Sequence, residues 1–259
     1  STRMLKENGL QKLYYLLLQK KICKLIQRSS LIITICESLA DAYHQEFGCA
    51  AKTVFSGANI AAESQPIVND SHCLSYFGNL KLGRNRSLRD IGLALDEINR
   101  IHDETYALNI YTGDRLPEIL QAFDSVKSIQ VMNFVSNDEV HQLMKESVML
   151  VHTESFEPPD IERVKYSMST KIADSLSSGV CLFAYGSDRI ASIQHLINNN
   201  CAAVATDICQ LQEVLWTYLS DSAKRFETAR QGLIAADKYH SDIKQSELLK
   251  TIFNGVISI

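Results

Sequence analysis

Residues 148–186 read VMLVHTESFEPPDIERVKYSMSTKIADSLSSGVCLFAYG, and this stretch decides the fold class. It opens with a continuous apolar run, 148–151, which is typical of a strand buried on both faces. Residues 171–178 have the apolar spacing of a helix, and 180–185 form a second apolar run. Two buried strands joined by a helix predict a parallel sheet, and the polar residues between them are the part of the chain expected to hold a ligand.

The same alternation continues on both sides of this stretch. A polar segment, 58–72, contains Pro66 and separates a short, incomplete first series from a longer second one. The pattern predicts an α/β fold whose parallel sheet carries helices on both faces. Further strands are predicted at 31–36, 52–55, 73–77, 108–111, 129–134 and 202–205, and helices at 10–27, 37–47, 88–101, 116–123, 138–145, 190–197, 211–240 with a break near 220–221, and 243 to the end.

Three residues are expected to mark helix ends. Gly48 follows the predicted helix 37–47 at the position where a left-handed residue ends a helix. Ser87 and Asn137 stand directly before two other predicted helices, where their side chains can accept hydrogen bonds from free N–H groups.

Composition argues against several functional classes. The chain has 259 residues and a formal net charge of -4, so it lacks the basic footprint of a nucleic-acid-binding surface. Its seven cysteines are odd in number and have no C-x-x-C spacing, which predicts reduced, buried thiols in the cytoplasm. No histidine stands at a metal-ligand spacing from a Cys, Asp or Glu, so we expect no metal site.

Residues 10–27 mix apolar side chains with Lys20, Lys21 and Lys24. We expect a domain helix with a solvated basic face, and the alternative is peripheral contact with the inner face of a membrane. No apolar run is long enough to span a bilayer, and the first residues lack the pattern of a signal peptide. The chain has no initiating Met and opens in helix-like sequence, which suggests a piece of a longer protein.

Ligands of open parallel sheets bind outside the carboxyl ends of the strands. Here that rule selects residues 78–86, 113–114, 153–170 and 185–189. In the first segment, Gly78 has no side chain to block a ligand, and Lys81, Arg84 and Arg86 lie near a helix start, which together favour an anion site. The alternative is a simple turn with solvated cations.

The second large segment is acidic and contains two prolines, and clustered acids can bind a metal or sugar hydroxyls. Glu154 is nearest the strand end and is the acid expected to face a pocket, whereas Glu157, Asp160 and Glu162 are expected in solvent.

At the end of this segment, Ser169 or Thr170 can cap the next helix and leave N–H groups for a phosphate. Lys171 and Asp174 share a face of that helix. They can meet a phosphate and ribose hydroxyls, or they can form a surface ion pair with each other.

Together these segments resemble the C-terminal lobe of a GT-B glycosyltransferase of the retaining family 4 type. The resemblance covers residues 31–240 and implies a Rossmann-like lobe at 58–240, the end of an N-terminal, acceptor-side lobe at 1–57, and a C-terminal helix at 241–259. The matching pieces are Tyr76-Phe77-Gly78-Asn79-Leu80 with Arg84 and Leu88, residues 108–113, residues 151–156, and residues 167–179 with Ala184-Tyr185-Gly186.

The resemblance implies sugar transfer, with retention and without a cofactor or metal, from a UDP- or GDP-sugar to a saccharide or lipid-linked acceptor in polysaccharide or glycoconjugate synthesis. It places Asp174 on the ribose, Lys171 with Arg84 or Arg86 on the diphosphate, and the backbone at 167–170 (Ser167, Ser169 and Thr170 among it) near the sugar. Gly78 and Asn79 would line the same site.

The sequence departs from the family at its Glu-x7-Glu pattern. The second Glu is Asp174 and the first falls on Tyr166, so the catalytic residue is unassigned, with Glu154 as the candidate. Two alternatives therefore stay open: a sugar-nucleotide epimerase of the same fold, and a non-catalytic nucleotide-sugar-binding or scaffold module.

Overall fold

The computed structural model describes residues 9–60 and 64–257. The chain divides into two compact units, one of Ser1–Phe55 with Leu248–Ile259 and the other of Ser56–Glu247. Within the described residues, no helix is both long and apolar enough to cross a membrane.

The first unit contains α1 (Gly9–Arg28), β1 (Ile32–Thr34), α2 (Glu37–Phe47) and β2 (Ala51–Thr53). The two strands pair in parallel, with Ile32 opposite Ala51. Gly48 ends α2 in the left-handed region at φ 66°, and its N–H donates to the His44 carbonyl at 2.9 Å. The predicted role of Gly48 is therefore confirmed, because a residue without Cβ adopts this conformation without strain.

The second unit is built on a six-stranded sheet in the order β5-β4-β3-β6-β7-β8, and every neighbouring pair is parallel. The chain moves outward from β3 through β4 to β5, returns to β6 beside β3, and moves outward the other way. The predicted parallel sheet is confirmed, and β3 and β6 flank its topological switch point. The strands are β3 (Cys73–Phe77), β4 (Ala107–Tyr111), β5 (Ile129–Met132), β6 (Met149–Thr153), β7 (Leu182–Tyr185) and β8 (Ala203–Ala205).

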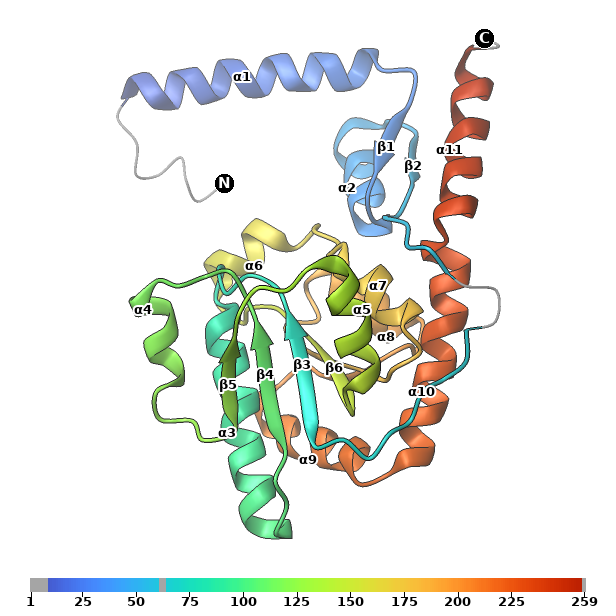
Figure 1. Cartoon of the computed structure of the whole chain (residues 1–259). Coiled ribbons are helices and arrows are strands. Elements are labelled where there is room, and N and C mark those ends of the chain that lie inside the picture. The colour runs from blue at the N-terminus through green and yellow to red at the C-terminus, as the bar shows by residue number, and fades with distance from the viewer. Residues whose placement is uncertain (1–8, 61–63, 258–259) are drawn as a thin grey trace. The chain divides into compact units, whose positions relative to one another are not determined.

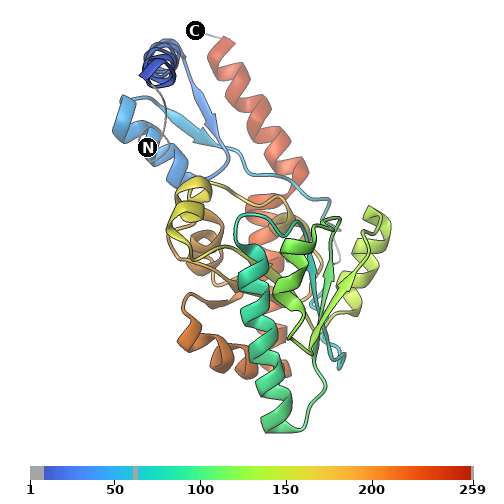
Figure 2. The ribbon, with the colours of Figure 1, turned by 90° about the vertical axis from the view of Figure 1, so that its left-hand side faces the viewer.

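Helices cover both faces of this sheet. On one face α3 (Arg84–His102) packs against α9 (Ile208–Leu219), and α5 (Asn137–Glu146) lies on the opposite face against β3. Seen from the side in Figure 2, α3 and α9 lie to one side of the strands and α5 to the other (compare Figure 1). The strand residues Leu74, Leu108, Met149 and Phe183 are 0% exposed, because both faces of the sheet are covered.

Two predicted helix starts are corrected. α3 begins at Arg84 rather than after Ser87, because Leu82 and Gly83 turn the backbone through the left-handed region at φ 56° and 75°. Ser87 is buried inside α3 and caps nothing. Ser136, not Asn137, caps α5, and its hydroxyl and the Glu139 side chain form a reciprocal capping box.

The acidic segment predicted as a loop contains a helix, α6 (Pro158–Val164). Pro158 occupies the first helical turn, where a missing N–H costs nothing and the fixed φ of proline suits a helix. Glu157 at the N-cap and Glu162 inside the helix are exposed, as predicted. The prediction that Asp160 lies in solvent is wrong, because its side chain is 20% exposed and accepts a hydrogen bond from Ser155 Oγ at 3.4 Å.

Ile67 and Asn69, in the polar segment before β3, form hydrogen bonds with other parts of the second unit. Ile67 donates its N–H to the Gly179 carbonyl at 2.7 Å, and Asn69 Nδ2 donates to the carbonyls of Lys145 and Ser147 at 3.1 and 3.0 Å. Gly179 has φ 80°, and a Cβ there would stand 2.5 Å from the Gln65 carbonyl oxygen. A glycine is required at this crossing.

The C-terminal helices follow the predicted break. α9 ends at Leu219 and α10 (Ser222–Ala235) begins three residues later, with the Asp221 side chain accepting from the Lys224 N–H at 3.0 Å. The π-helical turn η3 (Ala236–His240) leads to α11 (Asp242–Ile257), whose residues from Leu248 onward belong to the first unit. The other helices of the described residues are short: α4 (Pro117–Leu120), η2 (Gln121–Phe123), α7 (Lys171–Ser177) and α8 (Ala191–Asn198).

Candidate functional site

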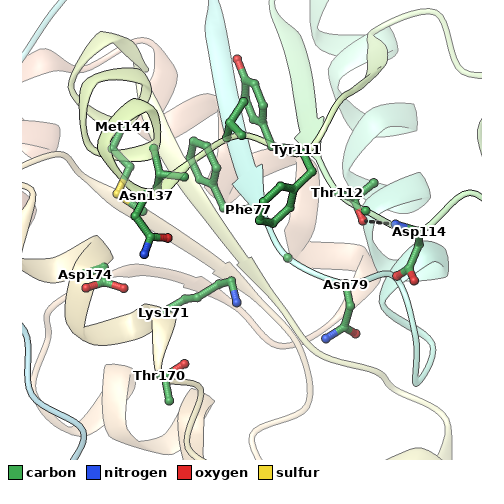
Figure 3. A pocket seen from close by; sticks show the side chains of 15 residues that line it. Phe77, Asn79, Tyr111, Thr112, Asp114, Asn137, Met144, Thr170, Lys171 and Asp174 are labelled. Atoms are coloured by element: carbon green, nitrogen blue, oxygen red, sulfur yellow. Dashed lines mark hydrogen bonds between the residues drawn. The ribbon is translucent and has the colours of Figure 1, made fainter.

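A cavity of about 440 Å³ lies at the carboxyl ends of β3 and β4, next to the switch point of the sheet. Figure 3 shows side chains from the strand ends, from α5 and from α7 pointing into it. Its wall is mostly apolar and aromatic on the side of β4 and α5, and polar at α7. The lining residues include Phe77, Gly78, Asn79, Tyr111, Phe134, Val135, Asn137, Met144, Thr170, Lys171 and Asp174.

A second, smaller cavity of about 240 Å³ adjoins the first. It is more polar, since Arg84, His152 and Ser169 belong to its lining. The two cavities have a common wall, so they form two compartments of one site. That wall consists of Phe77, Gly78, Asn79, Met144, Thr170 and Lys171.

Lys171 and Asp174 lie together in the first turn of α7 and both line the larger compartment. The two side chains make no ion pair with each other or with other described residues. Burial raises the pKa of Asp174, and the charges of His141 and Lys171 offset part of that rise. The surface ion pair considered from the sequence does not form, so both groups remain available to a ligand.

Thr170 stands at the N-cap position of α7, but its side chain makes no capping hydrogen bond. Its φ and ψ, -61° and -28°, are already helical. Thr170 lines both compartments and Ser169 lines the smaller one, whereas Ser167 lies outside both linings. The structure thus places two of the three predicted hydroxyl residues at the cavity.

Arg84 is held by a buried carboxylate. Its Nη2 donates to Oε2 and Oε1 of Glu154 at 2.8 and 3.0 Å, and its Nη1 donates to Asn79 Oδ1 at 3.1 Å. Glu154 is 1% exposed and lines neither compartment. Its carboxylate therefore balances the charge of Arg84 and does not face the open pocket that the sequence analysis expected.

His152 adjoins this pair. Its Nε2 lies 3.7 Å from Glu154 Oε1 and 3.3 Å from Ser192 Oγ. Burial lowers the pKa of His152, and the nearby Glu154 charge only partly reverses this effect. The ring is therefore neutral at pH 7 and presents a polar but uncharged group to the smaller compartment.

The other cation predicted for the diphosphate lies elsewhere. Arg86 Nη1 pairs with Glu157 Oε1 at 3.0 Å, and both side chains are more than half exposed. Arg86 lines neither compartment. Of the cations in the first loop, only Arg84 reaches the site.

Gly78 is needed for a reason that the sequence could not show. A Cβ at this position would stand 2.7 Å from the Tyr76 hydroxyl oxygen, and that hydroxyl donates to the Asn79 carbonyl at 2.6 Å. The buried tyrosine thus fixes the loop from below, while Gly78 and Asn79 line the cavity from above.

The aromatic wall was missed by sequence reasoning. Phe77 and Tyr111 stack with ring centroids 4.8 Å apart and an interplanar angle of 10°. Phe134, 77% exposed, lies two residues beyond the end of β5. An aromatic residue at the end of the predicted strand 129–134 was a usable signal, but the pairing of Phe77 with Tyr111 depends on the order of strands.

No protein-family model matches the sequence, and the search of curated proteins finds no match. Solved structures do match. TarM of S. aureus, in complex with UDP, fondaparinux and α-GlcNAc-glycerol, gives a TM-score of 0.71 at 11% identity over 91% of this chain and 46% of its own. HepE of Anabaena, in complex with UDP-glucose, gives 0.68 at 14% identity over 91% and 67%.

Sucrose-phosphate synthase of Thermosynechococcus elongatus gives a TM-score of 0.65 at 10% identity over 91% of this chain and 60% of its own. These likenesses show that the chain has the GT-B fold of glycosyltransferases. The chain spans 46% of TarM, 60% of the synthase and 67% of HepE, so it corresponds to about half to two thirds of the length of these structures.

Proposed function

We propose that this chain is the donor-binding part of a glycosyltransferase that takes its sugar from a nucleoside diphosphate sugar. The observation that carries the proposal is the position of Lys171 and Asp174 on one helical turn at the wall of a two-compartment cavity. Neither side chain has an ion-pair partner among the described residues. A cation for phosphate and a carboxylate for hydroxyl groups, side by side, are what a nucleotide requires.

The two compartments suit the three parts of such a donor. In our proposal the nucleoside occupies the larger compartment, with its base near Phe134 and its ribose hydroxyls donating to Asp174. The diphosphate lies at the common wall against Lys171. The sugar enters the smaller, polar compartment near Ser169 and His152.

The TarM and HepE structures support the choice of ligand, because the first contains UDP and the second UDP-glucose. We extend the proposal to UDP or GDP as the carrier and to a saccharide or lipid-linked acceptor in polysaccharide or glycoconjugate synthesis. Retention and membership of the family 4 type are part of this proposal and rest on the resemblance of residues 151–156 and 167–179.

The cations of the site make a bound metal unnecessary in this proposal. Lys171 supplies a positive charge without an ion-pair partner among the described residues, and Arg84 adds directed N–H donors although Glu154 already balances its charge. Glu154 then acts by orienting Arg84, and we assign no catalytic residue. A cytoplasmic location agrees with seven free cysteines.

The test is nucleotide binding by the chain. We expect UDP or GDP to raise the melting temperature, and Lys171→Ala to weaken the affinity, measured by calorimetry, by about tenfold or more, because a charge-assisted contact is lost. Asp174→Asn should weaken nucleoside diphosphate binding but leave inorganic pyrophosphate binding unchanged.

Lys81→Ala is the matched control, since Lys81 is an exposed lysine of the first loop outside both linings. The proposal fails if neither nucleotide binds at millimolar concentration, or if Lys171→Ala and Lys81→Ala lower the affinity equally.

A further inference from the structure

A separate cavity of about 450 Å³ lies at the opposite end of the strands from the donor site. Its walls come from residues just before β3, β4 and β6, and from the junction of α9 with α10. It shares no residue with the donor compartments. Its lining includes His72, Glu104, Tyr106, Trp216, Ser220, Ser222 and Arg225.

Arg225 is the unusual member of this lining, because its side chain is buried without a carboxylate partner. The residue is 4% exposed, and no ion pair of the described residues includes it. Its Nη1 donates to the carbonyls of Tyr218 and Leu219 at 2.8 and 2.6 Å, which closes the last turn of α9. Capping of α9 therefore accounts for the hydrogen bonds of Arg225 Nη1.

The other edge of the guanidinium is unexplained by the fold. Arg225 Nε is buried and has no hydrogen-bond partner. A buried donor without an acceptor is costly, more so when it carries charge, so such groups are normally paired with an acceptor. The Nε–Nη2 edge of an arginine matches the two oxygens of a carboxylate or a phosphate.

The acidic groups nearby do not fill this role. The Glu104 carboxylate pairs with His72 at 3.2 Å, and Asp70 is exposed. Burial raises the pKa of the Tyr106 phenol, the Glu104 and Asp70 charges raise it further, and Arg225 lowers it. Arg225 thus brings a buried positive charge to the cavity, whereas Glu104 is half-buried and Asp70 is exposed.

We propose that this cavity is a second ligand site, which binds a small molecule through a phosphate or carboxylate group held by Arg225. The hydroxyls of Ser220 and Ser222 stand in the same lining and can donate to the anion. Tyr106 and Trp216 provide flat surfaces for the rest of the molecule, and Trp216 is already fixed by stacking on His102 at 3.6 Å between ring centroids. This site does not depend on the proposed donor function.

The chain offers a direct readout, because Trp216 is its one tryptophan. Intrinsic fluorescence of the whole chain is titrated with inorganic phosphate in one series and with sodium benzoate in another, against sodium chloride at equal ionic strength. We expect a saturable change with phosphate, with benzoate or with both, and none with chloride. The preferred probe identifies the anion as phosphate or carboxylate.

The informative variant is Ser222→Glu, which places a carboxylate in the cavity at the first turn of α10, where an acid is favourable to the helix. We expect it to weaken probe binding by about tenfold or more through charge repulsion. Ser222→Gln is the matched neutral control and should bind nearly as well as the parent chain. Arg225→Lys, which keeps the charge but loses the two-pronged edge, should also weaken binding.

Lys171→Ala should leave the Trp216 response unchanged, since Lys171 lies at the other end of the strands. The proposal is overturned if neither probe gives a saturable change, if chloride gives the same change, or if Ser222→Glu and Ser222→Gln respond alike.

Discussion

At the scale of single residues, Arg84 was predicted to bind a ligand, and in the structure it binds the buried carboxylate of Glu154. Glu154 accepts two hydrogen bonds from Arg84, and its own carbonyl accepts from the buried Ser87 hydroxyl at 2.8 Å. Gly186 permits this packing, because a Cβ there would stand 2.9 Å from Glu154 Cβ. The pair ties the start of α3 to the end of β6.

Removing one partner of this pair leaves a buried charge. We expect Glu154→Gln to lower the free energy of unfolding by about 3–5 kcal/mol, because the Arg84 guanidinium loses its counter-charge in a buried site. Urea unfolding followed by Trp216 fluorescence measures the change.

The double variant Glu154→Gln with Arg84→Met is the control, and it should recover part of the loss because no unpaired charge remains. A loss in the double variant equal to the sum of the two single losses would show that the pair contributes no coupling energy.

The sequence alone identified Lys171 and Asp174 as neighbours, because residues three apart on one helix share a face. The status of Arg84 was not predictable in that way. Its partner Glu154 is far along the chain, and the two meet only because β3 and β6 are neighbours in the sheet. The same limit applies to Phe77 and Tyr111, whose stacking follows from the pairing of β3 with β4.

At the scale of elements, the junction of α8, η3 and the segment at Ser56 contains two buried histidines. His195 Nε2 and His240 Nε2 lie 3.1 Å apart, and His240 Nδ1 lies 3.1 Å from the Ser56 carbonyl oxygen. Burial, followed by repulsion from His240, lowers the pKa of His195 to about 4, and burial also lowers the pKa of His240.

These shifts predict acid sensitivity with a definite sign. A histidine whose folded pKa lies below its unfolded value of 6.5 contributes its full stability above pH 6.5 and loses it as the pH falls toward 4. We expect the titration of His195 to account for a fall of roughly 3 kcal/mol in the free energy of unfolding across this window.

Urea unfolding at a series of pH values tests the prediction by comparing the parent chain with His195→Gln. The variant should show a flatter dependence between pH 6.5 and 4. Parallel curves for the two proteins would mean that the titration of His195 does not contribute.

A second element-scale prediction concerns the segment that crosses Gly179. We expect Gly179→Ala to destabilise the chain by about 1–2 kcal/mol or more, because alanine is strained at φ 80° and its Cβ would meet the Gln65 carbonyl oxygen at 2.5 Å. Hydrogen exchange at the Ile67 N–H should become faster.

Gly113→Ala is the matched control, since nothing lies within 4 Å of a Cβ there and its φ is not in the left-handed region. Equal losses of stability in the two variants would contradict the explanation by local strain.

Some boundaries of helices and strands could be predicted from the sequence, and others could not. Apolar runs located the strands of the six-stranded sheet, and Ser220-Asp221 located the break between α9 and α10. The early start of α3 depends on the left-handed Leu82, a conformation that the sequence of a branched apolar residue does not predict. By contrast, the helix at Pro158 carried a usable signal that the acidic composition obscured.

At the scale of the whole molecule, every residue that lines the donor compartments and the Arg225 cavity belongs to the unit Ser56–Glu247. The buried core of the six-stranded sheet lies in the same unit. We therefore expect a chain trimmed to 56–247 to fold and to bind nucleoside diphosphate with the affinity of the parent chain.

Calorimetry on the trimmed and parent chains, with circular dichroism to confirm folding, makes the comparison. A trimmed chain that folds but binds more than about tenfold more weakly would show that the other unit contributes to the donor site. A trimmed chain that does not fold would contradict the prediction directly.

The wall common to the two compartments has a further consequence for the proposed donor, which concerns the length of its phosphate chain. Lys171 stands in both linings, so the two compartments meet at the first turn of α7. In the proposed binding mode, a nucleoside monophosphate leaves the smaller compartment empty, and the last phosphate of a triphosphate competes with the sugar for it, so we expect both to bind more weakly than a nucleoside diphosphate sugar.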